Sequence, residues 1–236
     1  MKKSYLTCLF ISLSVALFLM VCSGYFMNKA VSTFAAYMKE RGEKYIMIDA
    51  GHGGVDGGAV SCTGVYESAI NLEIALRLND LLQLLGYRTS MIRTEDISVY
   101  TSGNTIAEKK ISDLKERVRL INGIENCILI SIHQNFFQDS KYAGAQVFYS
   151  KSGEELARLI QTQFVSTVNR GSKRKCKRAE GVYLMNKINC TGVLVECGFL
   201  SNAAEESNLR SEDYQKKICC IIASGLSQYI NISPSA

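Results

Sequence analysis

The sequence is poor in proline and histidine, and both shortages bear on its organisation. It has one proline in 236 residues, Pro234, which argues against a proline-rich stalk. It has two histidines, His52 and His133, so any chemistry that needs an imidazole depends on these two positions. It shows no internal repeat and no recognised nucleic-acid-binding motif, and its net charge of +5 is mild. We therefore expect no nucleic-acid partner.

The nine cysteines do not form an obvious disulfide framework. Cys8 and Cys22 lie in the first 27 residues, and the seven that remain are an odd number without the spacing of a metal knuckle. Cys127 and Cys197 lie in apolar runs, where cysteine behaves as a small core residue. The sequence alone leaves the redox state of the cysteines open.

The amino-terminal segment has the pattern of an export signal. Lys2 and Lys3 precede residues 4–27, which carry no charge and are rich in leucine, phenylalanine, isoleucine and valine. This stretch is long enough to cross a hydrocarbon layer of ~30 Å as a helix, so a removed leader and an uncleaved membrane anchor are both possible. We expect the remainder to be exported across the cytoplasmic membrane.

The domain organisation follows from this segment and from the pattern beyond it. We predict a signal peptide or signal anchor over 1–27, a linker over 28–43, one catalytic domain over 44–232 and a tail over 233–236. The one dense basic run, residues 173–178, is typical of a solvated loop, although it could also hold an anionic polymer, a lipid headgroup or an acidic partner.

Strand-like and helix-like segments alternate along the chain after residue 44. Strands are predicted over 44–49, 87–93, a run ending at 133, 144–150, 182–184 and 192–196, and helices over 67–85, 112–124, 153–170 and 212–230. Such alternation indicates an α/β fold, a mostly parallel twisted sheet with helices on both faces. A single domain of this class is expected to follow the hydrophobic segment.

Both histidines follow short apolar runs that read as buried strands. His52 comes after residues 46–50, and His133 comes after residues 127–132. Functional side chains of open α/β sheets gather at the carboxyl ends of strands, so the two imidazoles are expected to meet there. A single histidine is more often a structural residue, but the matching contexts favour a metal site. Zinc hydrolases use two histidines, one carboxylate and a water.

Two glutamates are candidates for the acidic groups of such a site. Glu67 lies in the first turn of the predicted helix, where it could reach His52 or simply interact with the helix dipole. Glu196 ends the apolar run 192–195, where an unpaired carboxylate is costly to bury. A neighbouring water activated by a metal would explain that position, because the carboxylate could accept the proton of the water.

Four ordered segments match a known family. They are 48–54, Glu67 with 71–72, 131–135, and 194–202. In order and spacing they resemble the zinc-dependent N-acetylmuramoyl-L-alanine amidases of the amidase-3 type, over about residues 44–230. The short length, the hydrophobic leader and the lack of a wall-binding repeat are most similar to the germination-specific members of that family.

The resemblance implies roles for the candidate residues. It implies that His52, Glu67 and His133 bind zinc and that Glu196 is the catalytic acid and base. The substrate would be peptidoglycan, cleaved at the amide between the lactyl group of N-acetylmuramic acid and L-alanine. In the spore-specific subgroup this removes stem peptides so that muramic-δ-lactam can form in the cortex, which would place the enzyme between the forespore membranes.

Three further positions match the family, and the sequence leaves their roles open. Asn135 could orient the His133 loop or touch substrate, and Arg93 and Arg117 could bind a stem-peptide carboxylate or form structural ion pairs. Phe136 and Phe137 depart from the small residue that many relatives carry, and should alter the rim of the cleft. The stretch 94–111 lacks the inhibitory helix of some larger relatives, so an uncovered cleft is expected.

Two other functions stay open at this point. Cys62 or Cys197 could act as the nucleophile of a cysteine amidase, with a histidine as base. Alternatively, the chain could bind peptidoglycan or activate another wall enzyme without catalysis. Since no wall-binding module is visible, we also expect that an envelope protein could position or activate the domain.

Overall fold

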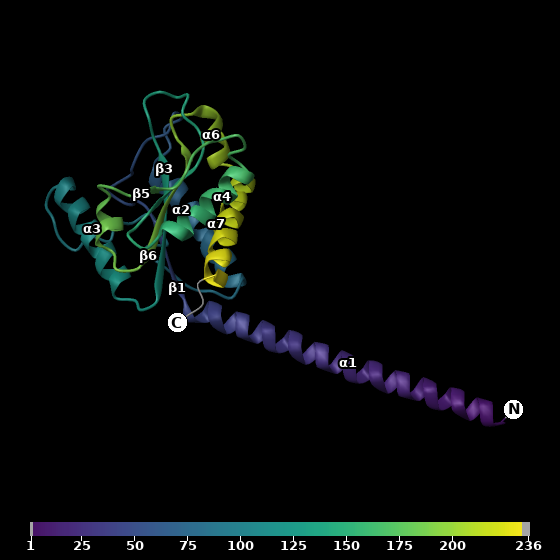
Figure 1. Cartoon of the computed structure of the whole chain (residues 1–236). Coiled ribbons are helices and arrows are strands. Elements are labelled where there is room, and N and C mark those ends of the chain that lie inside the picture. Colours follow the sequence, from purple (N-terminus) through teal and green to yellow (C-terminus); the bar gives the residue numbers. More distant parts are fainter. Residues whose placement is uncertain (1, 233–236) are drawn as a thin grey trace. The chain divides into compact units, whose positions relative to one another are not determined.

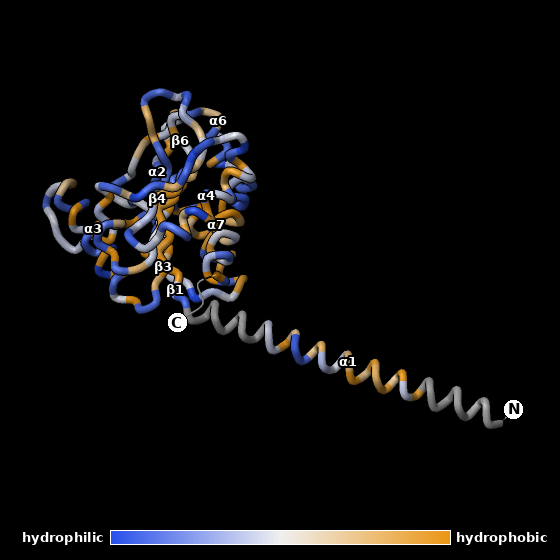
Figure 2. Tube along the Cα trace, viewed as in Figure 1, coloured by the Kyte–Doolittle hydropathy of each residue, from blue (hydrophilic) through white to orange (hydrophobic). Residues whose placement is uncertain are grey.

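The computed structural model describes residues 2–232, which divide into two units after Glu40. The first unit is most of helix α1 (Lys2–Glu43). Within it, Leu13–Thr33 is long and apolar enough to cross a membrane, with a mean hydropathy of 1.4 (Figure 2). None of this window is buried. The helix continues through the predicted linker 28–43, and the predicted tail 233–236 lies outside the described residues. The boundary between leader and linker stays a prediction.

The second unit is built on a six-stranded sheet with the order β2-β1-β3-β6-β4-β5. The strands are β1 (Tyr45–Ala50), β2 (Arg88–Met91), β3 (Cys127–Asn135), β4 (Gln146–Tyr149), β5 (Lys177–Arg178) and β6 (Thr191–Phe199). Every neighbouring pair is parallel except β4 with β6. The predicted α/β fold with a mostly parallel sheet is therefore confirmed.

Helices cover both faces of this sheet (Figure 1). They are α2 (Glu67–Leu84), α3 (Ile106–Asn122), α4 (Glu154–Ser166), α5 (Tyr183–Lys187), α6 (Ala203–Leu209) and α7 (Glu212–Ile232). Alternate residues of a strand point to opposite faces. Ile46 and Ile48 pack with α2, α4 and α7, whereas Met47 and Leu129 pack with α3 and α5. The central strands are consequently apolar on both faces, as expected for a buried parallel sheet.

Some predicted elements were wrong in type or length. The strand expected over 182–184 is absent, because residues 183–187 form α5. Three apolar residues are too few to separate a strand from a helical turn. The helix expected to start at 112 starts at Ile106, where Thr105 and Glu108 form a reciprocal capping box. The short elements β5 and α6 were not predicted.

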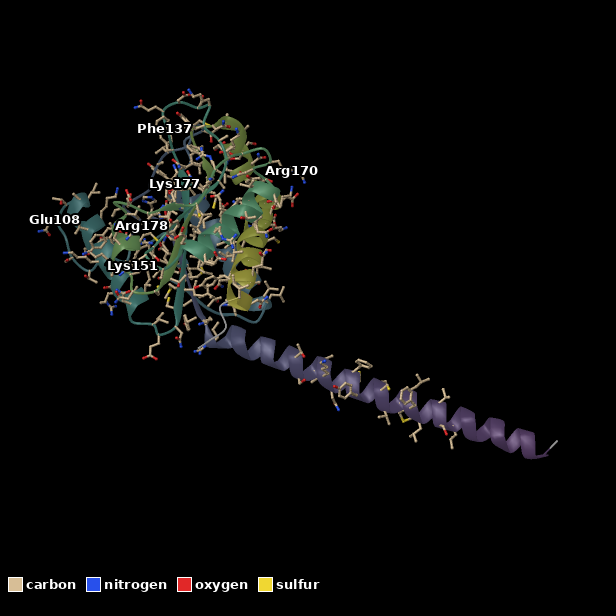
Figure 3. All side chains as sticks on the ribbon, in the orientation of Figure 1. Glu108, Phe137, Lys151, Arg170, Lys177 and Arg178 are labelled. Atoms are coloured by element: carbon tan, nitrogen blue, oxygen red, sulfur yellow. The ribbon has the colours of Figure 1, made fainter. Side chains whose placement is uncertain are left out.

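The basic run 173–178 lies along the sheet edge formed by β5. Lys177 and Arg178 are exposed (Figure 3), and charged residues on an edge strand discourage pairing with another chain. Arg174 is different, since it donates to the main-chain carbonyl of Ala143 and lies 5.0 Å from the centre of the Phe199 ring. The run is therefore partly a solvated edge and partly anchored to the domain.

A close contact between α4 and α7 yields a test of the packing. A Cβ atom added at Gly225 would lie 2.6 Å from Cγ1 and 2.9 Å from Cα of Ile160. In a free helix Gly→Ala stabilises by ~1 kcal/mol, but here the added methyl would force the helices apart. We predict that Gly225→Ala lowers the free energy of unfolding by about 1–3 kcal/mol, measured by urea denaturation of the full chain in detergent. Ser224→Ala at the neighbouring exposed position is the control, and an equal or stabilising effect at Gly225 would contradict this packing.

Candidate metal centre

The parallel register of three strands brings the predicted site residues to one edge of the sheet. Ala50 at the end of β1 pairs with Ile132 of β3, and His133 pairs with Glu196 of β6. His52 follows β1 by two residues, so it emerges at the same edge. Residues that are far apart in the chain thus meet because their strands end together.

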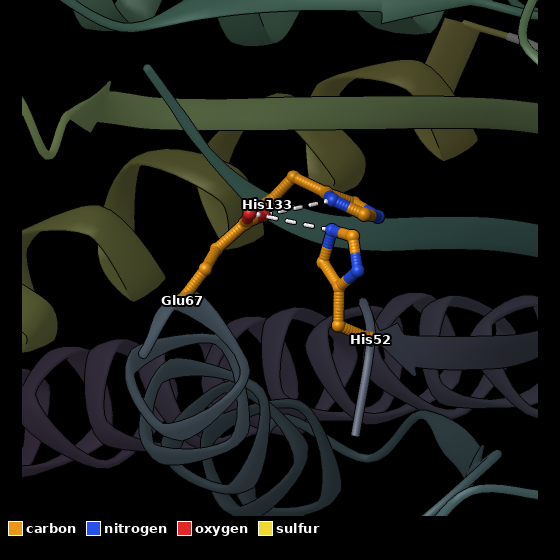
Figure 4. Close-up of side chains that lie close together, drawn as sticks. All are labelled: His52, Glu67 and His133. Carbon is orange, nitrogen blue, oxygen red and sulfur yellow. Dashed lines mark hydrogen bonds and ion pairs between the residues drawn. The ribbon is translucent and has the colours of Figure 1, made fainter. Parts of the chain in front are cut away.

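The Glu67 carboxylate contacts both imidazoles (Figure 4). Its Oε1 atom is 3.0 Å from Nδ1 of His133, and its Oε2 atom is 3.3 Å from Nε2 of His52. Each of the three residues offers a ligand atom, and these atoms lie within 4.8 Å of one another. Two imidazoles and a carboxylate are a donor set that suits zinc. The cluster could therefore hold a metal ion.

The Glu67 carboxylate is held by several donors besides the histidines. The main-chain N–H groups of Gln134 and Ala59 donate to it at 3.1 and 3.0 Å, and Asn71 Nδ2 donates at 3.2 Å. Burial alone would raise its pKa, but the hydrogen bonds and charges of both histidines hold the pKa well below its usual range. Glu67 is consequently an ionised carboxylate in a fixed position.

His52 is oriented by a residue that the sequence reasoning missed. Its Nδ1 atom lies 2.9 Å from Oδ2 of Asp56, whose other oxygen pairs with Lys110 at 2.8 Å. Burial opposes protonation of His52, but hydrogen bonds to Asp56 and Glu67 raise its pKa to about 9. A carboxylate on the far ring nitrogen is the usual support of a metal-binding histidine. In the sequence, the position of the acidic residue Asp56, four residues after His52, was the one sign of this contact.

The backbone around the cluster is shaped to admit these side chains. His52 has a φ of 60°, in the left-handed region that is uncommon for residues other than glycine. A Cβ atom at Gly51 would lie 2.3 Å from the His133 ring, and one at Gly58, which has a φ of +70°, would lie 2.6 Å from Glu67 Oε2. Because glycine has no Cβ atom, the His133 ring and the Glu67 carboxylate can lie directly against the backbone at these two positions.

Glu196 faces the cluster without a polar partner of its own. Its Oε2 atom is buried, and no hydrogen-bond partner for it exists among the described residues. Burial raises the pKa of this carboxyl group to about 7, although the charges of the histidines oppose the shift. A carboxyl group that changes protonation near neutral pH is suited to take up and return a proton.

Two predicted substrate contacts, Arg93 and Arg117, are instead tied into the domain beneath the site, and each is 2% exposed. Arg117 forms ion pairs with Asp49 and Asp113 and donates to the main-chain carbonyl of His52. Arg93 donates to four main-chain carbonyls, those of Ala50, Gly51, Ser68 and Glu95. These contacts favour the structural alternative for both guanidinium groups.

Asn135 is the last residue of β3, and the two phenylalanines after it begin the loop that leaves this strand. The Asn135 carbonyl accepts a hydrogen bond from the Leu200 N–H at 2.8 Å, which ties this loop to the end of β6. Phe136 and Phe137 are about half exposed, and the Phe137 ring packs edge to face against Tyr142. Both rings are thus exposed on this loop, and the change that they make in the rim of the cleft stays a prediction.

A cavity of about 300 Å³ opens beside the cluster. One wall comes from α3, through Lys110 and Leu114, and another from the segment around α5, through Val182 and Tyr183. His52 and His133 line its floor together with buried residues of the sheet. Because α3 starts at Ile106 and not at residue 112, the last residues of the stretch 94–111 form part of a helical wall of this cavity.

The geometry can be compared with known proteins. The family model described as N-acetylmuramoyl-L-alanine amidase (Amidase_3) matches residues 46–228. The germination-specific N-acetylmuramoyl-L-alanine amidase of Bacillus subtilis is 38% identical over 190 residues, which cover 79% of each chain.

Solved structures agree with this match. The CwlD amidase from Clostridioides difficile, in complex with the GerS lipoprotein, superposes with a TM-score of 0.77 at 37% identity, covering 80% of this chain and 99% of that one. The catalytic domain of CwlV from Bacillus (Paenibacillus) polymyxa var. colistinus gives a TM-score of 0.67 at 28% identity, covering 80% and 99%. With the family model spanning most of the folded domain, this chain belongs to the N-acetylmuramoyl-L-alanine amidase family.

Proposed function

We propose that this amidase depends on zinc held by His52, Glu67 and His133, and that Glu196 is its catalytic acid and base. The observation that carries the proposal is the pairing of a compact donor set with a buried carboxylate oxygen that lacks a partner. Such an oxygen is costly in a folded protein unless it has a use. A water molecule beside the metal would satisfy it.

The donor set fits zinc on chemical grounds. Imidazole nitrogen and carboxylate oxygen are ligands of zinc in hydrolases, and the Asp56 carboxylate behind His52 supplies the expected outer support. When bound, zinc acts as a Lewis acid that polarises a carbonyl and lowers the pKa of water toward ~7. His52 and His133 would hold it through neutral rings, because a nitrogen that binds a metal carries no proton.

Glu196 supplies the proton transfers of the reaction. In its ionised form the carboxylate accepts a proton from the water that attacks the lactyl carbonyl carbon of N-acetylmuramic acid. It then delivers that proton to the nitrogen of L-alanine, so that the amide bond breaks and a carboxyl group and a free amine are released. A pKa of about 7 suits both steps, because the group gains and loses a proton at little cost.

The biological setting that we propose is the spore cortex. Removal of stem peptides there would expose muramic acid for conversion to muramic-δ-lactam. The name of the Bacillus subtilis relative, a germination-specific amidase, supports this setting. We propose export of the catalytic domain by the apolar segment Leu13–Thr33, as a membrane anchor or a cleaved signal, into the envelope or the space between the forespore membranes.

An envelope protein partner is part of the proposal. The described domain contains no separate wall-binding module, so another protein could place it on its polymer. The structure of the Clostridioides difficile relative contains the GerS lipoprotein, which supports a lipoprotein-type partner for this chain. Such a partner could position the domain or stabilise its zinc.

The cysteine-amidase alternative has little support. The Cys197 side chain is fully buried, and burial raises the pKa of its thiol well above the usual value, which opposes formation of the reactive thiolate. Cys62 is exposed, and none of the interactions found among the described residues joins its thiol to His52 or His133. Neither thiol has the base that nucleophilic catalysis needs.

The proton-transfer role predicts a specific loss in Glu196→Gln. The amide cannot accept the proton of water, so release of stem peptides should fall by about 10²–10⁴-fold while zinc content stays stoichiometric. Full-length protein in detergent would be assayed with purified peptidoglycan by mass spectrometry and for zinc by elemental analysis. Glu205→Gln, a partly buried glutamate that bonds main-chain N–H groups away from the cluster, is the matched control. Wild-type activity in Glu196→Gln would refute the role.

The support that Asp56 gives to His52 predicts a change in metal affinity. Asp56→Asn should weaken zinc binding by about 10–100-fold, because the neutral amide holds the imidazole less firmly. The affinity is measured by competition with a chelating dye, and excess zinc should restore most of the amidase activity. Asp139→Asn, at an exposed carboxylate, should leave zinc affinity unchanged. Equal affinities of the two variants would show that Asp56 does not support the site.

The cortex role predicts a chemical change in spores. Spores of the source organism that lack this gene should contain no muramic-δ-lactam in their cortex, because stem peptides stay attached. Muropeptide analysis by liquid chromatography and mass spectrometry would show this. A copy of the wild-type gene should restore the lactam, and the Glu196→Gln copy should not. Normal lactam in the deletion strain would exclude the role while leaving the amidase activity intact.

A further inference from the structure

Two cysteines stand next to each other at the end of the sheet opposite the metal centre. The register of the parallel strands β3 and β6 pairs Ile128 with Thr191. Cys127, the first residue of β3, is therefore the neighbour of Cys190, which precedes β6. Adjacent strands lie ~4.8 Å apart, and disulfides join Cα atoms that are ~4.4–6.8 Å apart. The backbone spacing suits a bond between these two residues.

The two side chains also share one face of the sheet. Cys127 and Leu129 belong to the apolar cluster beneath α3 and α5, and Cys190 packs against that same cluster. Leu194, which lies four positions beyond Cys190 and so points to the same face, is another member. Each thiol is the largest influence on the pKa of the other, which agrees with two side chains that are neighbours on this face.

We propose that Cys127 and Cys190 form a dithiol site that a small disulfide oxidant converts into a disulfide between β3 and β6. No role of the cysteines in the amidase reaction is involved. The other described cysteines lack such a neighbour in the sheet register, and Cys62 and Cys220 are exposed. Among the cysteine pairs of the described residues, Cys127 and Cys190 are held next to each other by the pairing of the central strands β3 and β6.

The surroundings of the two cysteines indicate which thiol reacts first with the oxidant. A cavity of about 190 Å³ opens at this end of the sheet and is lined by both cysteines. Cys190 is partly exposed there, whereas Cys127 is 6% exposed. Cys190 is thus the thiol that meets the oxidant first, because it is the more accessible of the two, and its thiolate is the attacking species.

The reaction is an ordinary thiol–disulfide exchange. The Cys190 thiolate attacks one sulfur of an oxidant RSSR, which forms a mixed disulfide and releases RS⁻. Cys127 then loses its proton to water and attacks the Cys190 sulfur, which releases the second RS⁻. The two protein thiols lose two electrons and two protons, and the oxidant is reduced to two RSH molecules.

The bond should affect stability rather than catalysis. It would close a loop of roughly 60 residues and so restrict the unfolded chain. His133 and Glu196 each lie six residues further along their strands, about 20 Å from the bond at ~3.3 Å per residue. The positions of the proposed ligand and acid should therefore not change when the bond forms.

The experiment uses the full-length chain in detergent, treated with oxidised glutathione or with dithiothreitol, then denatured and alkylated with iodoacetamide. After oxidation we expect two fewer alkylated cysteines, one cross-linked peptide containing Cys127 and Cys190, and a rise in Tm of about 5–10 °C. Cys127→Ala and Cys190→Ala should each abolish the cross-link and the rise in Tm, whereas Cys62→Ala should retain both.

The peptide map of the wild-type protein tests for the disulfide between Cys127 and Cys190 even if a variant does not fold. The proposal is overturned if Cys127 and Cys190 stay fully alkylatable after oxidation, if the cross-linked peptide contains another cysteine, or if glutathione remains attached to Cys190 as a mixed disulfide. A cross-link without a change in amidase activity is the expected result, and loss of activity together with zinc would contradict a purely stabilising bond.

Discussion

The parallel alignment of β1, β3 and β6 is the constraint on which the site depends. Main-chain hydrogen bonds fix the register, and the register decides that His133 pairs with Glu196 while His52 leaves β1 at the same edge. Because a slip of one residue moves every side chain to the other face, the apolar packing on both faces enforces that register. The core that stabilises the domain is therefore also what positions its chemistry.

A layer of buried charge connects this sheet to the loops above it. The Arg117 guanidinium joins α3 to Asp49 in β1 and to the main chain of His52, and Ser131 donates to Asp49 at 2.6 Å. Removing one partner of a buried ion pair costs ~3–5 kcal/mol, because the other charge is left without compensation. The arrangement stabilises one position of the loop that carries His52, as the proposed metal site requires.

The surroundings of Glu196, the proposed catalytic residue, differ from those of Glu67, the proposed ligand. Glu67 is surrounded by main-chain donors and both imidazoles, and its pKa is held low, so its charge is permanent. Glu196 receives no such donors, and burial raises its pKa to about 7. Two carboxylates close to the same histidines thus differ in protonation because their surroundings differ, a separation that suits one to binding and the other to proton transfer.

The sequence by itself determined the fold class and the meeting of His52 with His133, because apolar runs ending in a polar residue specify strands with functional ends. The amidase family was indicated by the resemblance of four ordered segments to that family. The sequence also identified Glu67 and Glu196. Only the tertiary structure decided that Asp56 supports His52, that Arg93 binds main-chain carbonyls while Arg117 pairs with Asp49 and Asp113, and that Cys127 faces Cys190. These relations join loops and strands that are distant or irregular in the chain, and neither periodicity nor spacing encodes which hydrogen bonds such segments form.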